Sequence, residues 1–530
     1  MKHPIVRKTC ALAVAFAVTG TSFVPAAFAA QPVTGGPESV QDWWTGGQNF
    51  IRQGKQLYAN TRRAKNVILF IGDGMGVSTV SAARIFDGQN QGKKGEEHML
   101  PFETFPYVAL SKTYSWDQQT SDSAPTMTAM VTGYKGREGQ LSVNHTTTRG
   151  ECDAAVIASK SLPTILEQAA AAGKSTGVVS TARITHATPA ATYSHTSVRD
   201  WEADNNIRAF EAAYGLPAGS CTVKDIAAQL IDVSPAVRAS LKVAMGGGRS
   251  YFYPNSVFDP ENTSSRGVRT DGRNLPNEWV STRGGASSAK YVWNKADFDA
   301  VNPASTEHLL GLFERSHMQY EADRNNGPTG EPSLTAMTEK SIQMLKKNSN
   351  GFFLHVEAGR IDHAHHAGNA KRALIDTVEF AKAIKKAYEM TDPNDTLILV
   401  SADHSHVFTI AGYPARGNPI LGLVKEVPNV DGDPVENAVD SLGLPYTTLG
   451  YANGPGWRGS LPTNSAVRPT LNEAQTTAVD FLQEATVPLG SETHAGEDVA
   501  IYASGPKAYL VRGVMEQNWI YHVMKEAFGF

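Results

Sequence analysis

The feature that most constrains the fold of this chain is a series of short apolar runs that alternate with helix-like segments. The first run, Val67 to Ile71, lies between Asn66 and Gly72. Such an uncharged run is typical of a strand buried on both faces of a sheet. Similar runs recur at 177–181, 351–356, 396–400 and 498–502. Segments that we interpret as helices precede the middle three runs, at 162–172, 333–346 and 370–388.

This alternation predicts an α/β fold with a central, mostly parallel sheet flanked by helices on both faces. A chain of 530 residues is long enough for one large unit of this kind with insertions. Two stretches have a less regular pattern. The first, at about 249–332, is rich in Gly, Asn, Arg and Ser, and the second, at about 407–492, is rich in Gly and Pro. We interpret both as surface insertions, the second as a crown-like lobe near the site. We therefore expect one domain over residues 30–530.

The first residues have the three parts of a secretory signal. Lys2, Arg7 and Lys8 precede an apolar run, and Ala27 to Ala29 forms an A-x-A cleavage pattern. We predict that residues 1–29 are a signal peptide and that the protein is exported, either periplasmic or secreted. The mature chain then keeps two cysteines, Cys152 and Cys221, which we expect to pair in an oxidising compartment. Two free buried thiols are the alternative.

The charge balance argues against two classes of partner. The chain has 48 basic and 52 acidic residues and no basic arm, so nothing indicates a nucleic-acid-binding module. After residue 30 there is no long uncharged apolar stretch, so we expect no membrane span.

Ser123 is predicted to lie at the N-terminus of a helix. The small and apolar residues after it have helical spacing, with Pro125 suited to a first turn and Gly133 to a stop. Free N–H groups and the positive end of the helix dipole favour an anion there. A serine at this place is most often a cap. It becomes a nucleophile only if other groups remove its proton.

Acidic and imidazole side chains follow the ends of the predicted strands. They come from five distant segments: Asp73; His186 and Thr188; Glu357, Asp362, His363, His365 and His366; Asp403, His404 and His406; and His494. Each one alone has an ordinary explanation as a cap, turn or surface residue. Ligands of open parallel sheets bind outside the carboxyl ends of the strands, so we expect these groups to converge.

Two subsets have the chemistry of metal ligands. Asp362 and His366 are four residues apart, so on a helix they share one face, and their oxygen and nitrogen atoms suit Zn²⁺. Asp73, Thr188 and Glu357 form an all-oxygen set, which favours a hard ion such as Mg²⁺.

Taken together, the motifs resemble those of the alkaline phosphatase family, and they follow in order over about residues 64–530. They are FIGDGMG with Asp73, DSAPT with Ser123, HATPA with Thr188, HTSVRDWEAD with Arg199, VEAGRIDHAHH, TLILVSADHSHV and ETHAGEDV. The resemblance is closer to the animal enzymes than to the bacterial prototype.

This resemblance implies a function, cofactors and residue roles. The function is the hydrolysis of phosphate monoesters at alkaline pH through a phosphoserine at Ser123, with Arg199 as phosphate clamp. The implied ligands are Asp362, His366 and His494 for a first zinc ion, Asp73, Asp403 and His404 for a second, and Asp73, Thr188 and Glu357 for one magnesium ion. His186 and His363 would lie near magnesium and phosphate, as in the animal pattern.

The resemblance implies three further features. It suggests the disulfide between Cys152 and Cys221 and a homodimer. It also suggests a calcium site in the first insertion, formed by Glu261, the carbonyl of Phe313, Glu314 and Glu331.

Two other functions compete with this interpretation. A sulfatase, a phosphodiesterase or a metal-dependent mutase on the same scaffold would share the ligands, but Met127 stands where a sulfatase motif requires an arginine. An exported zinc-storage or phosphate-binding protein would need the ligands but not an aligned nucleophile, and would tolerate Ser123→Ala.

Overall fold

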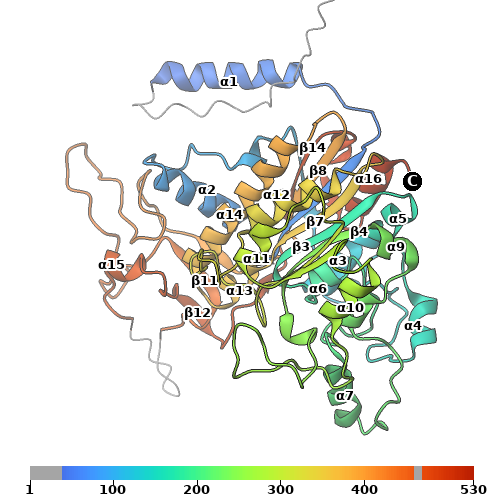
Figure 1. Cartoon of the computed structure of the whole chain (residues 1–530). Helices are drawn as coiled ribbons and strands as arrows, with labels where there is room; N and C mark the ends of the chain where they lie inside the picture. Colours follow the sequence, from blue (N-terminus) through green and yellow to red (C-terminus); the bar gives the residue numbers. More distant parts are fainter. Residues whose placement is uncertain (1–38, 459–467) are drawn as a thin grey trace, which may run out of the picture.

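The computed structural model describes residues 39–458 and 468–530, and the predicted signal peptide lies outside these ranges. Its centre is a ten-stranded sheet in the order β15-β2-β14-β8-β1-β7-β3-β4-β6-β5 (Figure 1). Only β14 runs against the other strands, because it pairs antiparallel with both neighbours. The strands are β1 (Asn66–Gly72), β2 (Tyr107–Lys112), β3 (Ser175–Arg183), β4 (Leu241–Gly247), β5 (Ala289–Val292), β6 (His308–Leu312), β7 (Phe352–Ala358), β8 (Thr396–Ser401), β14 (Val499–Ser504) and β15 (Val514–Glu516).

Helices cover both faces of this sheet, as the alternation of runs predicts. Along β1, Val67, Leu69 and Ile71 pack on the side of α3, α5 and α16. Ile68 and Phe70 pack on the opposite side with α2, α12 and α14. A strand between two apolar layers needs apolar residues at every position, which explains the uninterrupted runs. The helices are α1 (Val40–Lys55), α2 (Val77–Asn90), α3 (Ser123–Thr132), α4 (Ala154–Lys160), α5 (Ile165–Ala171), α6 (Ala187–Ala190), α7 (Asp204–Ala213), α8 (Ile226–Ile231), α9 (Pro235–Ser240), α10 (Leu275–Thr282), α11 (Lys295–Ala300), α12 (Leu334–Leu345), α13 (Arg360–His366), α14 (Ala370–Met390), α15 (Glu473–Thr476) and α16 (Trp519–Phe528).

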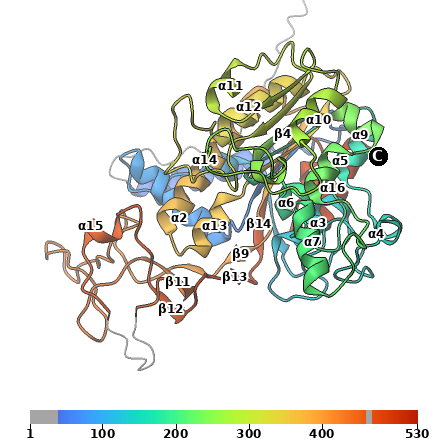
Figure 2. The ribbon, with the colours of Figure 1, turned by 60° about the horizontal axis from the view of Figure 1, so that its bottom comes forward.

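The two stretches interpreted as insertions differ in structure. Part of 249–332 belongs to the central sheet, because β5 and β6 extend it at one edge. The segment 407–492 holds a separate three-stranded sheet of β10 (Phe408–Ile410), β11 (Leu449–Gly454) and β12 (Ala485–Pro488). Figure 2 shows this small sheet and α15 as a lobe at the side of the main body. Strand β9 (Ser405–His406) precedes the lobe in sequence and β13 (His494–Ala495) follows it. The two strands pair as an antiparallel ribbon.

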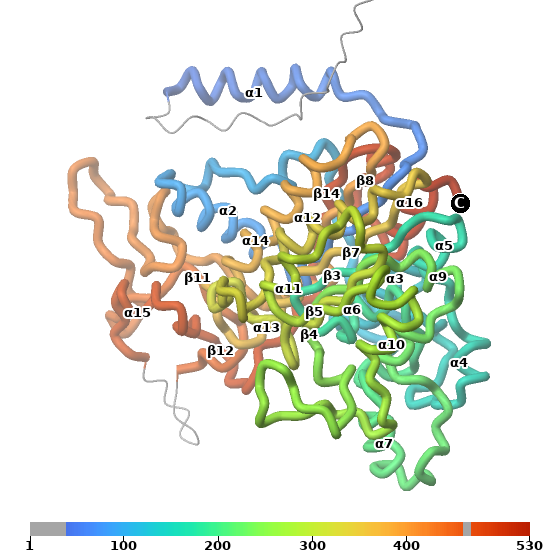
Figure 3. The backbone as a smooth tube through the Cα atoms, viewed as in Figure 1, coloured from blue at the N-terminus to red at the C-terminus, as the bar shows by residue number. Residues whose placement is uncertain are grey.

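Helix α1 lies outside the compact body, as the backbone trace shows (Figure 3). None of its residues is buried, and Trp43, Trp44, Phe50 and Ile51 expose more than half of their surface. In the described part of the chain, no helix combines the length and the apolar character that a membrane span requires. The expected disulfide between Cys152 and Cys221 is present, which confirms that prediction.

Candidate active site

Ser123 is the first residue of α3, as predicted, and the helix ends at Gly133 in the left-handed conformation. The Ser123 side chain is buried, and its Oγ lies 3.2 Å from His404 Nε2 and 3.5 Å from Asp73 Oδ1. The hydroxyl therefore faces the side chains that follow β1 and β8. Asp122 occupies the N-cap position of α3 without bonding the helix through its side chain, which instead pairs with Arg199.

A first group of ligand-type atoms surrounds Asp362 on α13. Asp362 Oδ1 lies 3.3 Å from His366 Nε2 and 3.4 Å from His494 Nε2, and the two imidazole nitrogens are 3.1 Å apart. The i, i+4 spacing on α13 and the ribbon strand β13 bring these three residues together. Burial opposes ionisation of Asp362, but the neighbouring His366, His406 and His494 hold its pKa well below the usual range.

The structure adds His406 and Glu492 to this group. His406 Nε2 lies 2.8 Å from Asp362 Oδ1, and its Nδ1 lies 2.6 Å from Glu492 Oε2. The Glu492 carbonyl also accepts a hydrogen bond from His366 Nδ1. We expected His406 to pack or to orient its neighbours, whereas Glu492 was not singled out, although it begins the ETHAGEDV motif. Only the pairing of β9 with β13 places them together.

A second group forms around His404. Its Nε2 lies 3.3 Å from both Asp73 Oδ1 and Asp403 Oδ2, and all three side chains are fully buried. Asp403 is oriented by the Gly74 N–H, which donates to its Oδ1 at 3.0 Å. Burial and the neighbouring carboxylates raise the pKa of Asp73 well above its usual value, and burial raises the pKa of Asp403 to about 6.

A third group lies on the other side of Asp73. Candidate ligand atoms of Asp73, His186 and Glu357 lie within 4.8 Å of one another. Asp73 Oδ2, Thr188 Oγ1 and Glu357 Oε1 are buried and have no hydrogen-bond partner. Burial raises the pKa of Glu357 to about 8. Buried oxygens without partners are costly, and a cation among them would satisfy them, so this donor set fits a hard metal ion.

Arg199 lies between Asp122, at the start of α3, and His186. It forms an ion pair with Asp122, and its Nη2 donates to His186 Nε2 at 2.8 Å. Burial and the Arg199 charge lower the pKa of His186 well below its usual value, so its ring is a neutral acceptor. His363 lies beside His186, with ring centroids 5.5 Å apart. His365 bonds Thr79 and Tyr451 and packs on the ring of His406, with centroids 4.8 Å apart, as expected for a residue that packs or orients its neighbours.

The residues expected to hold calcium lie apart from this site. Glu261 is paired with Arg249 at 2.6 Å, whereas Glu331 Oε2 is buried without a partner. Burial and the charge of Glu314 raise the pKa of Glu331 to about 8. Among the described residues, these carboxylates do not form a group of three whose oxygens all lie within 4.8 Å, and the calcium site stays a prediction.

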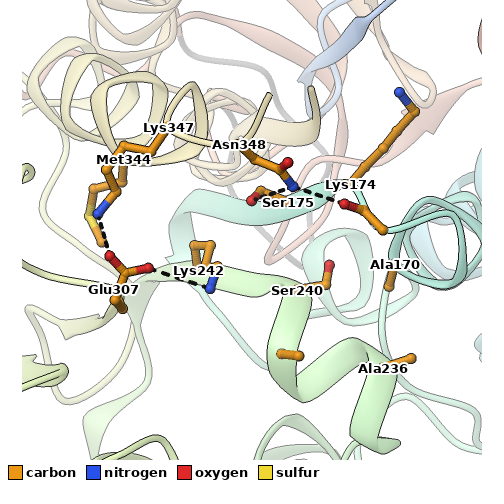
Figure 4. A pocket seen from close by; sticks show the side chains of 12 residues that line it. Ala170, Lys174, Ser175, Ala236, Ser240, Lys242, Glu307, Met344, Lys347 and Asn348 are labelled. Carbon is orange, nitrogen blue, oxygen red and sulfur yellow. Dashed lines mark hydrogen bonds and ion pairs between the residues drawn. The ribbon is translucent and has the colours of Figure 1, made fainter. Parts of the chain in front are cut away.

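Volume alone does not identify the active site. A hollow of about 440 Å³ is lined by residues before Ser123 and by His366 and His494. A hollow of similar size, about 470 Å³, lies at the amino ends of β3 and β4, the opposite edge of the sheet. Figure 4 shows that there Lys242 and Lys347 point to Glu307. None of the residues in the three ligand groups lines that second hollow, whereas His366 and His494 line the first.

Comparisons with known proteins agree with this geometry. A sequence model described as alkaline phosphatase matches residues 64–530. The tissue-nonspecific alkaline phosphatase of Gallus gallus is 44% identical over 93% of this chain and 90% of the relative, and the alkaline phosphatase of Gadus morhua is 44% identical over 88% and 92%.

Solved structures confirm the fold. The alkaline phosphatase of Thermus thermophilus superposes with a TM-score of 0.59 at 23% identity, covering 89% of this chain and 92% of that one. The enzyme of the Antarctic bacterium TAB5 gives 0.57 at 23%, covering 89% and 99%. The chain belongs to the alkaline phosphatase family, and its reaction is the hydrolysis of phosphate monoesters.

Proposed function

We propose that the reaction proceeds through a phosphoserine at Ser123, with two zinc ions and one magnesium ion in the three groups of ligands. The observation that carries this proposal is the convergence of the Ser123 hydroxyl, Asp73 and His404 at a helix N-terminus. Bound cations would supply Lewis-acid stabilisation of the developing charge and lower the pKa of the attacking hydroxyl.

The residues of the chain have separate tasks in this proposal. Asp362, His366 and His494 would hold the first zinc ion, and Asp73, Asp403 and His404 the second. Asp73, Thr188 and Glu357 would hold magnesium, with His186 beside them. The magnesium assignment is supported by the unpartnered oxygens of that group, and a mutant of the TAB5 enzyme carries Mg in a site named M3.

The chemistry follows in two displacements. Ser123 loses its proton and Oγ attacks phosphorus, while the ester oxygen of the alcohol departs with the bonding electrons and takes up a proton. Water then attacks the phosphoserine, which releases phosphate and restores the hydroxyl. Arg199 offers a planar pair of donors to two phosphate oxygens in both steps. A serine alkoxide is more abundant at high pH, so we expect an alkaline optimum.

The test is Ser123→Ala, with Ser159→Ala, on the exposed surface of α4, as the matched control. Loss of the nucleophile should reduce kcat by about 10³-fold or more, with zinc and magnesium contents unchanged. Acid quenching with labelled substrate should trap phosphate on the unaltered chain only. Near-normal turnover of Ser123→Ala with metals bound would contradict the mechanism.

Chelation tests the metal assignment separately. A chelator should abolish activity, and zinc plus magnesium together should restore it, whereas either metal alone should restore less. Metal analysis of the purified protein should give about two zinc ions and one magnesium ion per chain. Full activity in a metal-free preparation would exclude the proposal.

We also propose that the protein is exported and forms a homodimer. The disulfide between Cys152 and Cys221 supports an oxidising compartment. The unburied apolar residues of α1 support an association with a second copy. N-terminal sequencing of the mature chain tests the cleavage after residue 29. Analytical ultracentrifugation distinguishes a dimer from a monomer.

A further inference from the structure

His317 lies beside the site, in a segment that sequence analysis assigned to an insertion. Main-chain hydrogen bonds attach this segment to the sheet on both sides of His317. The Gly248 N–H donates to the Ser316 carbonyl at 2.6 Å, and the Met318 N–H donates to the Thr181 carbonyl at 3.0 Å. His317 is therefore held over the carboxyl ends of β3 and β4, the edge that carries the active site.

The ring of His317 is fixed from behind by Arg183. Arg183 Nη1 lies 2.5 Å from His317 Nε2. The guanidinium is itself held by two bonds to Glu202, of 2.8 and 2.7 Å, and Thr185 also donates to this buried carboxylate. Because Arg183 binds two oxygens of a buried partner in a planar arrangement, it provides a rigid base for the imidazole.

The front of the His317 ring packs on His363. The two ring centroids are 4.0 Å apart, and His186 contacts both rings edge-on at 5.4 and 5.5 Å. His363 Nδ1 is buried and has no hydrogen-bond partner. No hydrogen bond therefore fixes the His363 ring through that nitrogen, and packing against neighbouring rings determines its plane.

We propose that His317 is a positioning residue that orients His363 toward the phosphate and thereby sets the affinity of the enzyme for phosphate and phosphate esters. The inference rests on the proposed function in one respect, that His363 faces the phosphoryl group of the substrate. His317 itself does not touch the reacting atoms. It acts through the ring contact, and Glu202 and Arg183 support that contact.

The experiment compares His317→Ala with His317→Phe, which keeps a ring but loses both hydrogen bonds to Arg183, from its main-chain N–H and from its guanidinium. An aromatic contact of this kind corresponds to about a two- to tenfold change in affinity. His317→Ala should raise both KM for an aryl phosphate and Ki for inorganic phosphate by that factor, with kcat changed less. His317→Phe should lie between His317→Ala and the unaltered enzyme, because it keeps the ring contact with His363 but not the support from Arg183. His98→Ala, whose imidazole bonds Asp87 outside the site, is the matched control and should change neither constant.

A double-mutant cycle shows whether His317 acts through His363. In a His363→Ala background, His317→Ala should cause no further increase in Ki. Additive effects, an unchanged Ki in His317→Ala, or a His317→Phe variant as weak as His317→Ala would overturn the inference. Metal content and Tm are measured for each variant, and His317→Leu replaces His317→Ala in the cycle if the latter does not fold. None of these outcomes depends on Ser123→Ala, which tests the nucleophile separately.

Discussion

At the scale of single residues, the site depends on partly or fully buried charges that are held by a partner. Arg199 is the clearest case, because its two terminal nitrogens bond Asp122 and His186. Asp122 directly precedes Ser123, so the start of α3 positions both the Ser123 hydroxyl and, through the ion pair with Asp122, the Arg199 side chain. A lysine could supply the charge there but not two parallel donors.

Arg199→Lys should therefore weaken phosphate binding by about tenfold or more, since charge-assisted hydrogen bonds contribute roughly 1.5–3 kcal/mol each. The measurement is Ki for inorganic phosphate together with KM. Arg208→Lys, in the surface pair with Glu211, is the control and should leave both constants unchanged. Equal Ki values for Arg199→Lys and the unaltered enzyme would show that Arg199 does not hold phosphate.

At the scale of elements, α3 illustrates how a helix end fixes a reactive group. All ten residues of α3 are buried, and the helix stops at Gly133, whose φ of 84° is in the left-handed region. A Cβ at Gly133 would lie 2.6 Å from the Tyr521 ring on α16. The same glycine therefore ends the helix and allows α16 to approach it.

Gly133→Ala should lower the free energy of unfolding by about 1 kcal/mol or more, from backbone strain together with the contact with Tyr521. Gly139→Ala provides the matched control, because Gly139 has a φ of 73° but open space around its Cβ position. The difference in Tm between the two variants measures the effect of the contact alone. If both lose the same stability, close packing at Gly133 has no role.

Strand β6, which lies between β4 and the edge strand β5, carries a buried histidine that makes stability depend on pH. Burial lowers the pKa of His308 to about 4, below the value of about 6.5 in an unfolded chain. The unfolded state therefore binds more protons between these values. The contribution of His308 to stability is complete above pH 6.5 and is lost as the pH falls toward 4.

Between pH 7 and pH 5 the free energy of unfolding should fall for the unaltered enzyme. For His308→Gln this fall should be smaller by about 2 kcal/mol. The glutamine amide can still donate to the Leu241 carbonyl, which His308 Nδ1 contacts at 2.8 Å. Denaturant unfolding at the two pH values measures the difference, with the exposed His145→Gln as control. An identical pH dependence in all three proteins would refute this assignment.

At the scale of the whole molecule, the large core is complemented by a small apolar cluster that includes Cys221 and Trp201, next to the disulfide. The disulfide joins residues that are 69 positions apart, and so restricts a long loop of the unfolded chain. It lies outside the groups of metal ligands. We therefore expect it to affect stability and not the reaction.

Replacing both Cys152 and Cys221 by alanine should lower the free energy of unfolding by about 2–4 kcal/mol, with kcat and metal content unchanged at moderate temperature. Treatment of the unaltered enzyme with a reductant should reproduce the loss. Addition of the same reductant to the double variant should have no effect. A double variant with unaltered Tm would show that the disulfide does not contribute to stability.

The sequence by itself determined five strands of the central sheet, β1, β3, β7, β8 and β14, and the chemistry at the strand ends. β1, β3, β7 and β8 are buried at nearly every position because helices cover both faces, and the side chains after them are recognisable ligands by type and spacing. The other five strands were not predicted. β2 alternates between buried and exposed residues, and β5 and β6 lie in a segment that is otherwise irregular. The buried strand β4 and the short edge strand β15 were also missed.

Only the tertiary structure decided which side chains support the ligands. Glu492 reaches His406 because β13 pairs with β9, and His317 reaches His363 because the segment after β6 bonds to β3 and β4. These contacts join residues far apart in the chain, and neither spacing nor composition encodes them. Ligand atoms can be predicted from local chemistry, whereas their orientation depends on packing between elements that meet only in the folded molecule.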